Sequence, residues 1–221
     1  MKKLTFGEVS SQFENLTKQE MLEFIAGDGI ILRGNGSSGS PYEISSGVAI
    51  GFASDATRNA ILGAIGQYNS AGGANGLLVN GKYYKFKIST YSGAADSNNY
   101  TLGNGTVRTI KDVGIGEVSG TPYNGDNPIY GVADANDQAA LYTQNHAGYQ
   151  NMSQSTVTQK AAAHELGHTY GLSDNQGSVM NTFSSSSSGY ISSSPGSVDA
   201  TAVSHMLQNG GIHWGQGVPT P

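Results

Sequence analysis

The chain has no cysteine, a single tryptophan and few charged side chains, which make up 12% of its 221 residues. The absence of cysteine excludes disulfide bonds, thiol nucleophiles and metal sites with thiolate ligands. No apolar run reaches the roughly 18 residues that a membrane-spanning helix needs. The formal net charge of −5 provides no basic patch, which argues against a nucleic-acid partner.

Glycine, by contrast, is abundant, with 32 residues, and serine and asparagine are frequent. This composition is typical of a turn-rich, neutral surface and of exported proteins. With 37% hydrophobic residues, the chain is long enough to bury a sizeable core. We therefore expect one domain, or one domain with a small appendage, that is secreted and monomeric.

The most informative stretch is a His-Glu-x-x-His motif formed by His164, Glu165 and His168. On a helix, residues four apart lie on the same face, so the two imidazoles can point to one position. Glu165 is rotated by about 100° from His164, where it can reach a water on a metal without binding the metal. The motif therefore predicts a helix that binds a catalytic zinc ion.

A third ligand must complete such a site. No glutamate follows Glu165, which excludes the class of zinc enzymes that take a glutamate from a later helix. The remaining downstream candidates are Asp174, Asp199, His205 and His213. Gly171 favours Asp174, because a glycine three residues after His168 can adopt the left-handed conformation, end the helix and let the chain turn back. Asp199 stays open as the alternative third ligand.

The residues from His164 to Met180 have the pattern His-Glu-x-x-His-x-x-Gly-x-x-Asp followed by methionine, which resembles the metzincin zinc endopeptidases. Most metzincins, matrixins among them, have histidine as the third ligand, and aspartate there resembles the snapalysin-like members. The gap between Asp174 and Met180 is short compared with matrixins. The resemblance implies these roles: zinc ligands His164, His168 and Asp174, general base Glu165, helix-ending Gly171 and Met-turn residue Met180.

The resemblance also implies an α+β fold. We expect a twisted, mostly parallel sheet with a backing helix and an active-site helix, and a small irregular C-terminal subdomain with one helix. The patterns place the backing helix at 54–70, with Ile61, Leu62, Ile65 and Tyr68 on one face, and an alternating strand at 83–91. The active-site helix is expected to begin near Ser155 or Thr156, and the last helix to span 198–208. Residues 139–143 are expected to form the exposed strand at the rim of the cleft.

The N-terminal segment differs from the rest of the chain. Residues 1–27 lack the apolar core of a Sec signal. Leu16, Glu20, Met21 and Phe24 resemble the positions of a double-glycine leader of bacteriocins, although Ala26 replaces the first glycine. The resemblance implies cleavage after Gly27 by a peptidase-containing ABC transporter; an ordinary amphipathic helix is the alternative. We expect residues 28–50 to be a linker or small β element and 51–221 to be the zinc metallopeptidase domain.

Together these features predict a secreted zinc endopeptidase that acts on a protein or peptide substrate. The alternative is an exported bacteriocin-like or binding protein that keeps the zinc helix without proteolysis. Structural calcium is a further option at Asp126, Asp134 and Asp137, although no EF-hand spacing is present. His146 is expected to be a polar surface residue, and the serine-rich stretch 184–191 to form a wall of the pocket.

Overall fold

The computed structural model describes residues 30–51, 53–92, 97–101, 107–111, 113–124, 127–133, 138–147, 152–181, 197–208 and 212–214. The predicted leader, the three aspartates proposed for calcium and the serine-rich stretch lie outside these residues. Among the described helices, none is long and apolar enough to cross a membrane.

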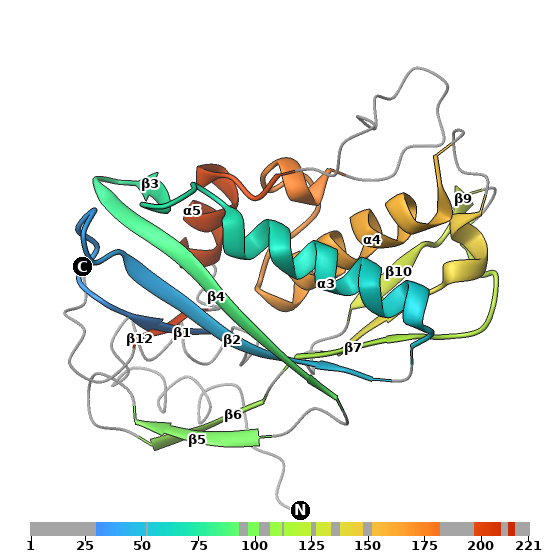
Figure 1. Ribbon diagram of the computed structural model, residues 1–221, viewed down its shortest axis with the longest axis horizontal. Coiled ribbons are helices and arrows are strands. Elements are labelled where there is room, and N and C mark those ends of the chain that lie inside the picture. Colours follow the sequence, from blue (N-terminus) through green and yellow to red (C-terminus); the bar gives the residue numbers. More distant parts are fainter. Residues whose placement is uncertain are drawn as a thin grey trace, which may run out of the picture.

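The fold is α+β, with helices on one face of a mixed sheet (Figure 1). The helices are α3 (Asp55–Ser70), α4 (Gln154–Thr169) and α5 (Ala200–Gln208), with 3-10 turns η1 (Thr143–His146) and η3 (Ser178–Met180). The main sheet contains β1 (Ile30–Arg33), β2 (Tyr42–Ile50), β3 (Leu77–Val79), β4 (Lys82–Ser92), β7 (Val113–Glu117), β10 (Gly131–Ala133), β11 (Gln138–Leu141) and β12 (Ile212–Trp214). Two hairpins complete the described strands: β5 (Ser97–Thr101) with β6 (Val107–Lys111), and β8 (Tyr123–Asn124) with β9 (Asn127–Pro128).

Strand β2 is at the centre of the sheet. β4 pairs in parallel along its whole length on one edge, while antiparallel β1 and parallel β7 share the other edge. Alternate residues of β2, such as Tyr42, Ile44 and Val48, are buried. The sequence placed residues 28–50 outside the peptidase domain as a linker or small β element, whereas β2 joins the strands on both sides. The weak strand preference of Ser45, Ser46 and Gly47 is overridden by this pairing.

Among the described strands, the sheet ends at β10 on the side of α4. β11 pairs in parallel with β7 and antiparallel with β10, so both of its edges are occupied. The expectation that residues 139–143 form the exposed rim is therefore wrong. β10 takes that place, because among the described strands it pairs only with β11.

Helix α3 follows the prediction closely. The Ser54 side chain accepts a hydrogen bond from the Thr57 N–H, which caps the first turn. Ile61, Ile65 and Tyr68 are buried, as predicted from their spacing, but Leu62 is exposed. β4 is also confirmed: its alternate residues Tyr84, Phe86 and Ile88 face the core.

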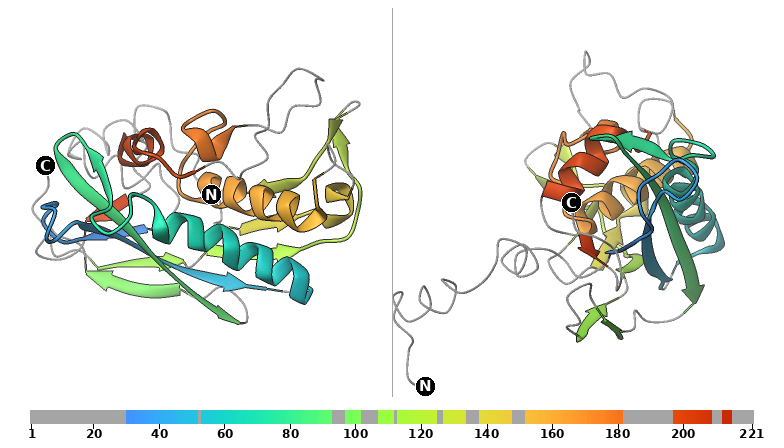
Figure 2. Two further views of the ribbon diagram at one scale, coloured as in Figure 1. Left: turned by 45° about the horizontal axis from the view of Figure 1, so that its top comes forward. Right: turned by 90° about the vertical axis from the view of Figure 1, so that its left-hand side faces the viewer.

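Helix α4 begins earlier than predicted. The Ser153 side chain accepts a hydrogen bond from the Thr156 N–H, so the helix starts at Gln154 and not at Ser155 or Thr156. α4 lies beside α3 and packs against β10, β11, η1 and η3 (Figure 2). Because neighbours surround it, most of its residues are buried, including three consecutive alanines that allow close approach. This packing fixes the direction of the helix that carries the motif.

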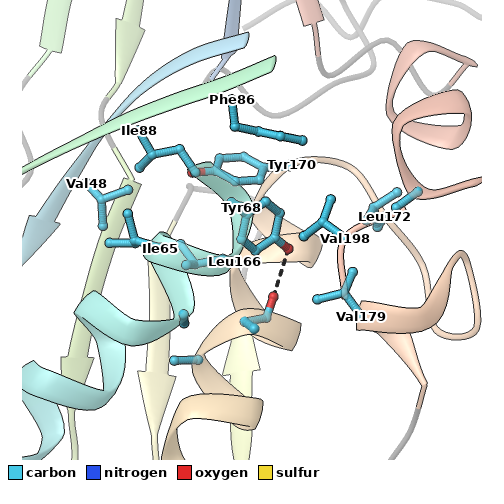
Figure 3. Packing of buried hydrophobic residues seen from close by; sticks show 14 of the residues in the cluster. Val48, Ile65, Tyr68, Phe86, Ile88, Leu166, Tyr170, Leu172, Val179 and Val198 are labelled. Carbon is cyan, nitrogen blue, oxygen red and sulfur yellow. Dashed lines mark hydrogen bonds between the residues drawn. The ribbon is translucent and has the colours of Figure 1, made fainter. Parts of the chain in front are cut away.

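A buried aromatic cluster joins α3 to the end of α4. The Tyr68 ring meets the rings of Phe86 and Tyr170 edge-on, at centroid distances of 5.2 and 5.6 Å (Figure 3). The Tyr68 hydroxyl donates a 2.8 Å hydrogen bond to the carbonyl of Ala163, the residue before His164. Burial raises the pKa of Tyr68 well above its ordinary value, so the hydroxyl keeps its proton. The backing helix thus contacts the motif directly.

Candidate metal centre

Three side chains converge beside the C-terminal half of α4. His164 Nε2 lies 3.1 Å from Asp174 Oδ1, and His168 Nε2 lies 3.5 Å from the same oxygen. The two imidazole rings are 4.7 Å apart and nearly perpendicular. Among the described residues, these three form a group whose ligand atoms all lie within 4.8 Å of one another. The structure thus brings together the three side chains that the sequence analysis selected as ligands.

The end of α4 brings Asp174 back towards the histidines. Gly171 has a φ of +82°, in the left-handed region that glycine adopts without strain. The Gly171 N–H donates to the His168 carbonyl and the Leu172 N–H donates to the Gly167 carbonyl, as in a Schellman motif. The predicted helix-ending role of Gly171 is therefore seen in the backbone.

A short closed loop then holds Asp174 in place. The Gln176 N–H donates to the Ser173 carbonyl, and the Gln176 side chain accepts from the Ser173 N–H, so the turn is bonded on both sides. The Asn175 N–H donates a 2.8 Å hydrogen bond to the Met180 carbonyl. These bonds accommodate the short gap between Asp174 and Met180, because the chain returns to α4 within six residues.

The two histidines have different surroundings. His168 Nδ1 lies 2.8 Å from the Leu172 carbonyl, which can only accept, so Nδ1 carries a hydrogen and Nε2 is the ring nitrogen turned towards Asp174. His164 is more buried: burial, followed by the neighbouring His168, lowers its pKa to about 4, while Asp174 opposes this change. A histidine with this pKa is neutral at neutral pH, as a metal ligand must be.

Glu165 lies on the buried side of α4, under the rim strand. The residue is 5% exposed. Burial, and to a smaller extent the charge of Asp174, raises its pKa to about 8 in the metal-free chain. A carboxyl group with a pKa in this range exchanges protons readily near neutral pH. Glu165 is therefore a candidate proton-transfer group beside the convergent ligands.

Met180 packs underneath the helix at Gly167. A Cβ placed on Gly167 would lie 2.1 Å from Met180 Sδ and 3.2 Å from the Tyr68 hydroxyl. Only glycine leaves room for this contact, and Met180 itself is fully buried. Gly167 lies one residue before His168, so Met180 packs against the part of the helix that carries the motif.

The donor set fits zinc. Bonds of about 2.0–2.2 Å in a tetrahedral arrangement place neighbouring ligand atoms about 3.3 Å apart. The observed distances of 3.1 and 3.5 Å are close to this value. Imidazole nitrogens and carboxylate oxygens are both ligands that zinc accepts in proteins. The 55% exposed side chain of Asp174 leaves the group open to solvent.

Of the other candidate ligands, Asp199 and His205 are placed elsewhere or used otherwise, while the side chain of His213 lies outside the described part of the chain. The Asp199 carboxylate accepts from the N–H groups of Ser178 and Ala202, so it caps α5 and joins it to η3. His205 lies half-buried on α5, and neither it nor Asp199 belongs to the metal-binding group among the described residues. This geometry favours Asp174 over Asp199 as the third ligand.

His146 is not a surface residue as expected; it is completely buried. Its Nδ1 lies 2.8 Å from Thr158 Oγ1 on α4 and its Nε2 lies 2.8 Å from the Tyr130 carbonyl. A histidine in a glycine-rich and asparagine-rich segment gave no sign of this environment, because its partners are 12 and 16 residues away.

Sequence reasoning also missed Gly131, which lies against Glu165 at the start of β10. The available signal was an isolated glycine in a strand, which often marks a close approach of another group.

No protein family, curated protein or solved structure matches this chain significantly.

Proposed function

We propose that the chain is a secreted zinc endopeptidase of metzincin type that hydrolyses peptide bonds in a protein or peptide substrate. The observation that carries this proposal is the convergence of His164, His168 and Asp174 beside the buried carboxyl group of Glu165. A purely structural zinc site would have no use for a base at that position. A site with three protein ligands and an adjacent base is typical of hydrolytic zinc enzymes.

The three ligand side chains would hold one zinc ion. Zinc bound there supplies Lewis acidity and lowers the pKa of a bound water to about 7. Leu172 contributes by orienting the His168 imidazole through its carbonyl oxygen. The exposed side chain of Asp174 marks the side from which a substrate can approach.

Glu165 performs the proton transfers in this proposal. One of its oxygens takes a proton from the attacking water while the water oxygen forms a bond to the carbonyl carbon of the substrate. The same carboxyl group then gives that proton to the amide nitrogen as the C–N bond breaks, and the products are a carboxylic acid and an amine. Burial of Glu165 beneath β10 keeps bulk water from competing for the proton.

The experiment compares the zinc-loaded wild type with Glu165→Gln on a mixture of peptides, with cleavage followed by mass spectrometry. We expect wild-type cleavage that chelators abolish, and a loss of about 10²- to 10⁴-fold in kcat for Glu165→Gln. Metal analysis should find one zinc per chain in both proteins, because the substitution removes the base and not a ligand. A zinc-loaded wild type that cleaves nothing would instead favour the alternative, an exported binding protein that retains the zinc helix.

A further inference from the structure

Gly131, the first residue of β10, leaves the space that the Glu165 carboxylate occupies. A Cβ placed on Gly131 would lie 2.6 Å from both Cγ and Oε1 of Glu165 and 2.8 Å from Cδ. These distances are shorter than any non-bonded carbon contact allows. The conflict is with the end of a flexible side chain, so a larger residue at 131 would move the carboxylate and leave the backbone in place.

The backbone next to Gly131 is held by two further elements. The Tyr130 carbonyl accepts hydrogen bonds from the Tyr142 N–H, at 3.0 Å, and from His146 Nε2, at 2.8 Å. His146 Nδ1 is bonded in turn to Thr158 on α4. Thr158 is seven residues before Glu165, which places both on the same face of the helix. His146 therefore joins the start of β10 to the helix face that carries Glu165.

The protonation of His146 follows from these partners. The Tyr130 carbonyl can only accept, so Nε2 carries the proton and Nδ1 is an acceptor. The Thr158 hydroxyl then shares its hydrogen between Nδ1 and the Gln154 carbonyl, which is also 2.8 Å away. Burial lowers the pKa of His146, while the bond to Tyr130 and the charge of Glu117 oppose this shift. The neutral imidazole is consistent with its role as a fixed spacer between α4 and β10.

We propose that Gly131 is a positioning residue for Glu165, and that the His146–Thr158 pair anchors Gly131 at the distance from α4 that this position requires. The proposal rests on the proposed function, since it assigns these residues to the placement of the base. Gly131, His146 and Thr158 are not members of the metal-binding group among the described residues. In this proposal Gly131, His146 and Thr158 determine the direction of the Glu165 carboxylate, whereas His164, His168 and Asp174 would bind the metal without their help.

The first test is Gly131→Ala. We expect kcat to fall about 10²-fold, the cost of a misplacement of about 1 Å, with KM and zinc affinity unchanged. The melting temperature should stay close to that of the wild type, because only the flexible end of Glu165 has to move. Gly114→Ala is the matched control, because the atoms nearest to its Cβ would be those at the end of the Gln138 side chain on the neighbouring strand. We expect wild-type kcat for this variant.

The second readout does not require activity. Carbodiimide and an amine modify accessible carboxyl groups, and mass spectrometry measures the modified fraction of Glu165 in zinc-free protein. We expect little modification in the wild type and in Gly114→Ala, and several-fold more in Gly131→Ala, because the carboxylate is displaced from its buried position. If the zinc-loaded wild type cleaves no peptide, the proposed function fails, and the proposal that Gly131 positions a base for peptide hydrolysis fails with it. The labelling tests the position of Glu165 separately from activity. If the wild type is active but Glu165 is modified to the same extent as in Gly131→Ala, the proposed function stands and the positioning role of Gly131 fails.

The anchor is tested with Thr158→Val and Thr158→Ser. The valine variant keeps the shape but loses the hydroxyl, so we expect a lower kcat at unchanged zinc affinity and more labelling of Glu165; the serine variant should restore both. Wild-type kcat and labelling in Gly131→Ala would overturn the proposal. A fall in zinc affinity large enough to explain the loss of kcat would also overturn it. The same holds if Thr158→Ser has a kcat no higher than that of Thr158→Val.

Discussion

At the level of single residues, the metal centre combines side chains of very different exposure. The His164 side chain is 9% exposed, that of His168 29% and that of Asp174 55%. The buried histidine is fixed by the core, while the aspartate depends on a four-residue turn at the surface. The affinity for zinc should therefore respond most sharply to changes at Asp174 that leave the fold intact.

Asp174→Asn should weaken zinc binding strongly, because a neutral amide oxygen replaces a charged ligand. We expect a loss greater than the roughly 10- to 100-fold that removal of an outer-shell partner costs. Competition with a fluorescent chelator measures it. Asp199→Asn is the control, because asparagine also caps helices and should keep α5 in place. Retained affinity in Asp174→Asn together with lost affinity in Asp199→Asn would show that the ligand has been assigned wrongly.

Gly167→Ala should destabilise the protein, because the added Cβ would overlap Met180 Sδ. Overpacking of this kind costs about 1–3 kcal/mol in the free energy of unfolding. The control is Gly66→Ala on α3, where an added Cβ meets nothing within 4 Å. That variant should be more stable by about 0.5–1 kcal/mol, since alanine favours a helix. Urea denaturation of both proteins without zinc measures the difference, and equal stability of the two would contradict the tight contact.

At the level of elements, the sharp end of α4 determines where the third ligand lies. Gly171→Val would force a β-branched residue to positive φ, at a cost on the order of 1–3 kcal/mol. We expect lower stability and weaker zinc binding together, because the turn that carries Asp174 follows directly. Gly171→Asn is the milder variant, since asparagine tolerates the left-handed conformation. Normal zinc affinity in the valine variant would mean that another turn can replace this one.

Glu117, on β7, is hydrogen-bonded to η1 and to the residue before α3, and it should make the free energy of unfolding depend on pH in the acidic range. Its carboxylate accepts from the Thr143 hydroxyl of η1 and, at 3.0 Å, from the Ser54 N–H before α3. These hydrogen bonds, that of Thr143 foremost, lower the pKa of Glu117 from 4.5 to about 2. Because the folded pKa is depressed, the stabilisation is present above about pH 4.5 and is lost as the pH falls towards 2.

Glu117→Gln should therefore lose less stability than the wild type between pH 6 and pH 3. Urea midpoints at both pH values, measured with chelator so that zinc release does not contribute, provide the comparison. Glu43→Gln removes a carboxylate from the partly exposed ion pair with Lys87 and serves as the control. Equal acid sensitivity of Glu117→Gln and the wild type would contradict this assignment.

At the level of the whole molecule, the sequence predicted features that depend on near neighbours. The Ser54 cap, the alternation of β4 and the turn at Gly171 were all predicted correctly, because each depends on residues within a few positions. The convergence of His164, His168 and Asp174 belongs to the same class, since one helix and one turn produce it. The α+β class followed from the motif.

Features that depend on distant pairing were predicted less well. The sequence predicts a linker or small β element over residues 28–50, because the serines and glycine of β2 conceal a long strand whose partners lie 42 and 65 residues away. The rim was assigned to β11, because nothing in the local pattern tells which of two short strands is outermost. The burial of His146 and the contact of Gly131 with Glu165 likewise depend on how β10 packs against α4, which no local pattern describes.

The closeness of the ligands along the chain has a thermodynamic consequence. His164, His168 and Asp174 lie within eleven consecutive residues. In the unfolded chain, bringing the three side chains together therefore closes only a short loop, which has a small entropic cost. If the proposed function holds, zinc would then bind the unfolded state as well, only more weakly. Once free zinc exceeds both dissociation constants, the gain in stability equals RT times the logarithm of their ratio and no longer grows with concentration. Added zinc should therefore raise the melting temperature only to a plateau, whose height measures how much folding improves the preorganisation of the ligands.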